Sequence, residues 1–429
     1  MAILTASVIT LACGSRSALL DAEGASGAAG TGSGAATGGG SGLGGLGGDG
    51  GSGDCSGLTR VQPAVAVEKS GFQTDSGPAL ASASDEGEQI VVAFKRVAGT
   101  PAHAELRHAT LEPWASWPPN GLLSPTYLTN SNALPLGGFR VGSSTGGQFG
   151  ALAEYQGFLF FSPAINAADG GSGPLSPFAP GTPAFVIGGA PGAHLVGWHT
   201  EASELYAGIA DSSGSNPFTF KLGCSPVKLV ADGTRHGDGW LVAHSNGKSS
   251  PASGCWTPSD AGPPTRIDIS RVTKDKDKPV APVAGMDRPM PVVALATARH
   301  PDGMYVVWRE ASGGAAAPIQ WALFGASQSA IVGTGQVSAS PDHPLEFAAT
   351  ALGERLAVAY RTGTAGEPSA VVVQVQEPWG TVVAKTKVES QSSGQLAVAG
   401  SPSGNSLIVA VGGGSGGAAI NLSRFDCVL

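Results

Sequence analysis

The sequence has little of what a helical protein or a nucleic-acid-binding protein needs. Charged residues make up 13% and aromatic residues 6% of its 429 residues. We find no stretch with apolar residues at the i, i+3, i+4, i+7 spacing of an amphipathic helix. The net charge of −8 argues against a nucleic-acid partner, which would require a basic face. Glycine and proline are abundant instead, at 66 and 31 residues, and such a composition is typical of an all-β protein with many short strands and turns.

The first thirteen residues, MAILTASVITLAC, are apolar and too few to span a bilayer, but they suit the core of a signal peptide. Leu11 and Ala12 before Cys13 resemble the lipobox of bacterial lipoproteins, in which small residues precede a cysteine that becomes lipidated. The resemblance implies lipidation of Cys13, export, and anchoring to the cell envelope, at the outer membrane or the cell surface. Thr10 stands where a lipobox has leucine, and the alternative is an ordinary apolar N-terminus with a chance cysteine.

A glycine-rich segment follows. Between Gly24 and Gly53, 16 of 30 residues are glycine, and such a composition cannot bury a core and behaves as a flexible coil. We therefore predict that residues 14–54 form a disordered tether with a root-mean-square reach of roughly 35 Å. The predicted organisation is a signal peptide and lipobox (1–13), this tether (14–54) and one domain (55–429).

Seven segments of the predicted domain share one pattern. Each begins with a strand rich in Ala, Gly, Val and Ser, passes a turn that contains glycine, and enters a more hydrophobic strand. The segments are 78–96, 139–155, 184–200, 227–245, 292–310, 345–362 and 395–413. Six intervals separate residue 78 from residue 395, which gives 317/6 or about 53 residues each, close to the length of a four-stranded β-propeller blade.

This repeat predicts an all-β fold, a single seven-bladed β-propeller. Six or eight blades are possible because segment 139–155 is the least regular, and a two-sheet sandwich is the main rival fold. Small residues suit the crowded innermost strand, and bulky residues such as Phe94, Trp198, Trp308 and Tyr360 suit the strand that packs between blades. The pattern is similar to sialidase, kelch and WD-type repeats and to bacterial propeller lipoproteins generally, without a motif specific to one family.

Ring closure predicts the disulfides. The chain ends with a third strand, and the missing fourth strand could come from Ala64 to Lys69, so that no sheet edge is left open. That pairing would bring Cys55 near Cys427, and the even number of cysteines after Cys13 suits an exported protein. We predict the disulfides Cys55–Cys427 and Cys224–Cys255.

The residues just after each second strand are expected to lie together on one face of the propeller, where they would form a rim around the axial opening. Several are cations or imidazoles, which would suit an anionic or hydroxyl-rich ligand such as a glycan, although solvated strand ends are the alternative. The candidates are Lys95, Arg96, His199, Glu201, Arg309, Glu310 and Arg361.

Catalysis has weaker support in the sequence. The chain lacks the Asp-box of sialidases, and the paired carboxylates of a glycosidase cannot be assigned. No histidine set has metal-ligand spacing, so we predict neither a metal nor a cofactor. We expect a monomeric, lipid-anchored binding module with a glycan or protein ligand. A carbohydrate-active enzyme of the sialidase, glycosidase or lyase type and a purely structural envelope protein are the alternatives.

Overall fold

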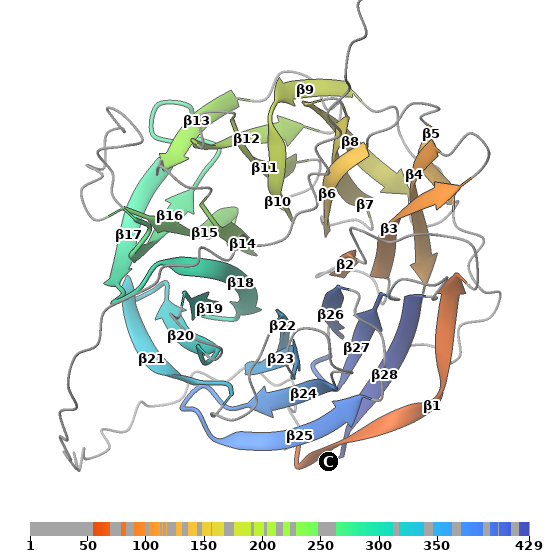
Figure 1. Cartoon of the computed structure of the whole chain (residues 1–429). Coiled ribbons are helices and arrows are strands. Elements are labelled where there is room, and N and C mark those ends of the chain that lie inside the picture. The colour runs from red at the N-terminus through yellow and green to blue at the C-terminus, as the bar shows by residue number, and fades with distance from the viewer. Residues whose placement is uncertain are drawn as a thin grey trace, which may run out of the picture.

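The described part of the chain contains 28 β-strands, which form seven antiparallel sheets of four strands each. In this computed structural model the sheets are arranged like blades around a central axis, with the first strand of each blade innermost (Figure 1). The residues that the structure describes are 55–68, 79–82, 90–98, 103–111, 114, 117, 126–130, 136–143, 148–155, 157–166, 176–189, 193–200, 204–211, 218–223, 229–247, 263–311, 317–338, 346–362, 370–388, 395–401, 403–412 and 420–428.

The first four blades follow one another along the chain. Blade 1 consists of β2 (Ala79–Ser82), β3 (Ile90–Ala98), β4 (His103–Leu111) and β5 (Thr126–Asn130). Blade 2 consists of β6 (Leu136–Ser143), β7 (Gln148–Tyr155), β8 (Phe158–Asn166) and β9 (Ser176–Pro180). Blade 3 consists of β10 (Thr182–Gly188), β11 (Ala193–His199), β12 (Leu205–Asp211) and β13 (Phe218–Gly223). Blade 4 consists of β14 (Ala231–His236), β15 (Gly239–Asn246), β16 (Arg266–Val272) and β17 (Val280–Asp287).

The last three blades complete the ring. Blade 5 consists of β18 (Val292–His300), β19 (Gly303–Glu310), β20 (Gln320–Gly325) and β21 (Ala330–Gln336). Blade 6 consists of β22 (Phe347–Leu352), β23 (Arg355–Arg361), β24 (Val371–Gln376) and β25 (Val382–Val388). Blade 7 consists of β26 (Leu396–Gly400), β27 (Ser406–Val411), β28 (Ile420–Val428) and β1 (Gly57–Glu68), which comes from the other end of the described chain.

The core lies between blades, where the second strands carry the bulk. Phe94, Trp198, Trp308 and Tyr360 are all buried, as the repeat predicts. The innermost strands, which pair with these second strands, consist mostly of small residues. For example, Ala296 of β18 lies opposite Val307 of β19. Since each blade buries one hydrophobic strand against the next blade, the ring is stabilised by seven similar interfaces rather than by one central core. The propeller prediction is confirmed with seven sheets, including the irregular segment in blade 2.

The ends of the described chain close the ring by sheet pairing and by a disulfide. β1 runs antiparallel to β28 from the pair Gly57–Val428 to the pair Glu68–Ile420, so the fourth strand begins seven residues before the predicted Ala64. Cys55 and Cys427 are disulfide-bonded with a Cα–Cα distance of 5.1 Å, which confirms that prediction. Cys13, Cys224 and Cys255 lie outside the described residues, as do the predicted signal peptide and tether.

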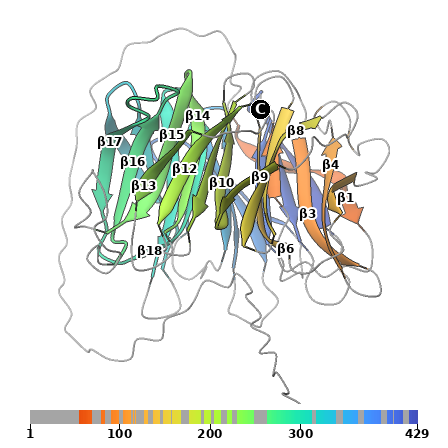
Figure 2. The ribbon, with the colours of Figure 1, turned by 90° about the horizontal axis from the view of Figure 1, so that it is seen from above.

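The propeller has two faces of different construction, seen edge-on in Figure 2. The hairpin face carries the turns that join first to second and third to fourth strands. Hydrogen bonds place these turns together: Ala326 N donates to Asp302 O in blade 5, and Cys427 N donates to Asn405 O in blade 7. The crossover face carries the second-to-third connections and the links between blades. The charged loop Lys274–Lys278 lies on the hairpin face and is exposed.

Candidate functional site

The predicted rim residues lie at the ends of second strands and therefore on the crossover face. Those within described strands are His199 (β11), Arg309 and Glu310 (β19), Arg361 (β23), and Lys95 and Arg96 (β3). Nothing is described of the side chains of Lys95 and Arg96, or of Glu201. The remaining four share one face, but three of them are buried, and Arg309 is half-buried.

Glu310 fastens blade 5 to the link from blade 4. Its Oε1 atom accepts hydrogen bonds from Arg288 Nε at 2.7 Å and from the indole N–H of Trp308 at 3.2 Å. Arg288 lies in the link, donates a second bond to Gln320 Oε1 at 2.6 Å, and stacks over the Trp308 ring with its Cζ atom 4.8 Å from the ring centroid. A planar guanidinium can meet a carboxylate, an amide and an indole together, so this cluster is a structural clamp.

We expect Glu310→Ala to destabilise the fold by about 2 kcal/mol, because it leaves the partly buried Arg288 and the Trp308 N–H without their acceptor. Urea unfolding of the purified protein measures this change. Asp287→Ala is the matched control, since Asp287 forms an exposed ion pair with Arg266 at 3.2 Å and should cost less than about 0.5 kcal/mol. Equal stability of Glu310→Ala and the unmodified protein would refute the clamp.

His199 contacts the link to the next blade, and Arg361 pairs with Glu346 of its own blade, which in turn reaches the next blade. His199 Nε2 lies 2.7 Å from Leu229 O, just before blade 4. Arg361 Nε lies 3.7 Å from Glu346 Oε2, and Glu346 Oε1 accepts a bond from Leu396 N at 2.8 Å. Burial lowers the pKa of Arg361 and raises the pKa of Glu346, while the opposite charges partly compensate. These contacts give Glu310, His199 and Arg361 structural roles, and a ligand on this rim stays a prediction.

The innermost strands present an unpaired backbone edge to the axis, and side chains of the preceding blade bond to parts of it. Asp232 Oδ2 of β14 accepts a bond from Thr297 N of β18 at 2.8 Å. Thr350 Oγ1 of β22 accepts a bond from Gly400 N of β26 at 3.1 Å. An exposed strand edge is a template for unwanted pairing, so these contacts protect the ring and position polar side chains around the axis.

Arg140 and Asp232 are a pair of opposite charges near the axis. Arg140 of β6 donates from Nε to Ala184 O at 2.9 Å and from Nη1 to Phe139 O at 2.8 Å. Its charge acts on Asp232 although blade 3 lies between their blades. The residue is exposed, yet surrounding protein desolvates the guanidinium and lowers the pKa of Arg140. Arg140 therefore combines an exposed side chain with a guanidinium that nearby protein atoms desolvate.

Asp232 shares this environment. Burial raises the pKa of its carboxyl, while hydrogen bonds from Thr297 and Gly233 and the charge of Arg140 act in the opposite direction. Neither Arg140 nor Asp232 was among the residues predicted from the sequence. The signal was present, because a charge in an innermost strand stands out among small residues, as in FRVGS and VADGT. Asp232 is the single carboxylate in the described residues of the seven innermost strands.

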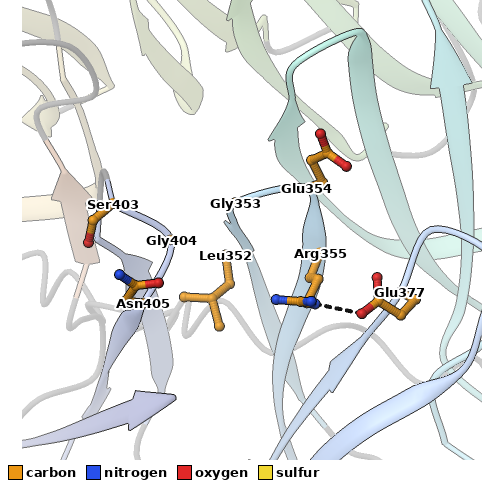
Figure 3. Close-up of a pocket in the computed structure, with 8 residues that line it drawn as sticks. All are labelled: Leu352, Gly353, Glu354, Arg355, Glu377, Ser403, Gly404 and Asn405. Atoms are coloured by element: carbon orange, nitrogen blue, oxygen red, sulfur yellow. Dashed lines mark hydrogen bonds and ion pairs between the residues drawn. The ribbon is translucent and has the colours of Figure 1, made fainter. Parts of the chain in front are cut away.

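The hairpin face has a shallow hollow between blades 6 and 7 (Figure 3). Its volume is about 40 Å³, which is room for a few water molecules. Arg355 Nε and Glu377 Oε1 form an ion pair at 2.6 Å along one side. Two turns meet at the hollow: a Cβ atom on Gly404 would lie 2.7 Å from Gly353 N, and both glycines have positive φ. Glycine is required at this contact, and the hollow is too small to enclose a sugar ring.

Within the part of the chain that the structure describes, no group of three or more His, Cys, Asp or Glu side chains could hold a metal ion. In the same residues, no helix is long and apolar enough to cross a membrane.

Comparison with known proteins finds similarity in structure only. No protein-family model matches the sequence, and no curated protein does. A protein of unknown function from Dyadobacter fermentans is 14% identical with a TM-score of 0.47, over 87% of this chain and 100% of that one. The β-propeller domain of the Trilobed protease from Pyrococcus furiosus is 9% identical with a TM-score of 0.47, over 83% and 94%. The NanB sialidase from Streptococcus pneumoniae is 7% identical with a TM-score of 0.46, over 85% and 71%. Identities this low carry no information on what the chain binds.

Proposed function

We propose that this propeller is a binding protein of the cell envelope, anchored through a lipid on Cys13, that takes a carboxylate-bearing glycan at its axis. The Cys55–Cys427 disulfide supports the export part of the proposal, because such bonds persist in oxidising compartments. The glycine-rich segment before Cys55 supports display on a tether.

The observation that carries the ligand class is Arg140. Its two hydrogen bonds to backbone carbonyls use two of five N–H donors and fix the guanidinium in place. Within the described residues, the other N–H donors of Arg140 meet no acceptor. The side chain is exposed, so a ligand can reach these donors. A fixed guanidinium with unused donors suits a carboxylate, which accepts two parallel hydrogen bonds.

The surroundings favour a sugar acid over a simple anion. Innermost strands present backbone N–H and C=O groups to the axis, and these can bond hydroxyls. The predicted cations Lys95, Arg96 and Arg309 on the crossover face would attract an anion toward that end. Binding is favoured over hydrolysis by a two-carboxylate glycosidase, because that chemistry needs two facing carboxylates. Among described innermost-strand residues, Asp232 is the one carboxylate.

Calorimetry with glucuronate and glucose tests the proposal. We expect glucuronate to bind more tightly than glucose, and Arg140→Met to weaken glucuronate binding by about tenfold, since a charged hydrogen bond contributes about 1.5–3 kcal/mol. Lys276→Met is the matched control, because it removes the same charge from an exposed loop on the hairpin face. Equal binding of the two sugars, or equal affinity in Arg140→Met and Lys276→Met, would overturn the ligand assignment.

A further inference from the structure

Large apolar side chains are exposed mainly in one sector of the hairpin face. Six such side chains are exposed among the described residues. Four of them lie at the hairpin-face ends of blades 5, 6 and 7: Val332, Trp379, Val382 and Val428. The other two, Phe158 and Met290, lie on the crossover face in different blades. We call the first four residues the apolar sector.

Trp379 is the most exposed of them, at 75%, and a tight turn holds it in place. Gly380 N donates to Glu377 O at 2.9 Å, and Glu377 N donates to Thr381 O at 2.9 Å. Gly380 has a φ of +95°, the conformation that closes a hairpin turn of this kind. The tryptophan is therefore presented at the tip of a rigid turn, and its exposure is built into the backbone.

The N-terminal 54 residues join the propeller beside this sector. Cys55 is bonded to Cys427, whose neighbour Val428 belongs to the apolar sector. β1, which begins there, runs beside β25 of blade 6, the strand that starts at Val382 (Figure 1). A tether that carries a lipid on Cys13 would thus connect the membrane to the hairpin face of the propeller at blades 6 and 7.

Basic residues flank the sector on blades 4 and 5. Burial is the main cause of the lowered pKa of His236. The nearby charges of Arg271 and Arg299 lower this pKa further, while the charge of Asp302 acts in the opposite direction. The loop between β16 and β17 adds three exposed lysines and two exposed aspartates between Lys274 and Lys278. With Arg235, Asp238 and the nearby Asp302 included, the hairpin face of blades 4 and 5 carries six cations and four carboxylates, a small positive excess on a protein whose net charge is −8. A positive surface is attracted to anionic lipid headgroups.

We propose that the hairpin face of blades 5–7 rests on the membrane to which the chain is anchored, with Trp379 in the headgroup region. This inference rests on the anchoring part of the proposed function. Tryptophan is favoured at membrane–water interfaces because its ring is apolar and its N–H finds polar partners there. The attachment point at Cys55 and the exposed apolar side chains therefore favour the same face.

Vesicles of phosphatidylcholine and phosphatidylglycerol with brominated acyl chains provide the test, because bromine quenches the fluorescence of tryptophan within the bilayer. The full chain, produced in a bacterium with a lipoprotein pathway, is reconstituted into these vesicles. We expect quenching in the unmodified protein, and most of it should be lost in Trp379→Ser. Phe158→Ser, which removes an exposed aromatic residue from the crossover face, is the matched control and should quench normally.

The variant Cys13→Ser tests the lipid anchor independently of the membrane-facing surface. In this variant, added to the same vesicles, Trp379→Ser should lower the vesicle partition coefficient by about tenfold. Mass spectrometry reports whether the unmodified chain carries a lipid. A lipidated chain whose quenching is equal in Trp379→Ser and Phe158→Ser would overturn the face assignment and leave the anchoring intact. A chain without lipid whose vesicle binding still depends on Trp379 would overturn the anchoring and support the face.

Discussion

Replacement of both Cys55 and Cys427 by serine is expected to lower the free energy of unfolding by about 3–5 kcal/mol. The bond joins residues 372 positions apart, so without it the unfolded chain gains nearly the full entropy of an open polymer. The native ring also depends on β1, which comes from the opposite end of the chain and is held by its pairing with β28. Loss of the bond would let β1 detach and expose the edge of β28.

Urea unfolding followed by circular dichroism measures this effect, and reduction of the unmodified protein should lower its stability at least as much, because a reductant breaks both predicted disulfides. A single Cys55→Ser variant is expected to behave like the double variant, because either change removes the same bond. Addition of a reductant to the double variant then reports on the predicted Cys224–Cys255 bond, since no other predicted disulfide remains. Unfolding of the double variant at the same urea concentration as the unmodified protein would show that strand pairing alone closes the ring.

The fold was predictable because the repeat constrains every blade in the same way. A strand near the axis must have small side chains, and the next strand must have bulky ones. A sequence such as VVALATARH followed by MYVVWRE therefore identifies the first and second strands of a blade. The prediction held even in blade 2, where β6 and β7 depart from the pattern. It fell short at β1, which begins at Gly57, because pairing with β28 continues past the region of alternating hydrophobicity.

The roles of polar residues were much less predictable. Glu310 looked like a rim residue, but its partner Arg288 comes from the link between blades, 22 positions earlier, and no spacing rule connects the two. Arg140 and Asp232 were missed because composition assigned the innermost strands to packing alone. A charge two blades away acts on a residue only once the ring closes, so sequence patterns that describe one blade cannot contain this effect.

The second large effect expected is a loss of stability in acid that depends on His194. This side chain of β11 is buried, and neither ring nitrogen has a hydrogen-bond partner within the part of the chain that is described. It packs edge-on against Phe161 and lies next to Gly150, where no larger residue fits. Burial alone lowers the pKa of His194 to about 4. The folded protein therefore resists protonation of this ring, whereas the unfolded chain takes up the proton near pH 6.5.

The direction in which stability changes with pH follows from proton binding. Between pH 6.5 and pH 4 the unfolded state binds more protons than the native state, so the free energy of unfolding falls as the pH falls. The difference between the two pKa values corresponds to about 3 kcal/mol at pH 4. Asp232 and Glu346, whose pKa values burial raises, act in the opposite direction, so the protein must be compared with a variant rather than with itself.

His194→Phe is that variant, because it keeps the aromatic contact with Phe161 and removes the titrating group. Urea unfolding at pH 7 and pH 4 should show that the unmodified protein loses about 3 kcal/mol more than His194→Phe does. His194→Leu, which is smaller, guards against a steric effect of phenylalanine beside Gly150. His236→Gln is the control, since His236 is only half-buried and should change the pH dependence less. An identical loss in the unmodified protein and both His194 variants would mean that another buried group governs the acid response.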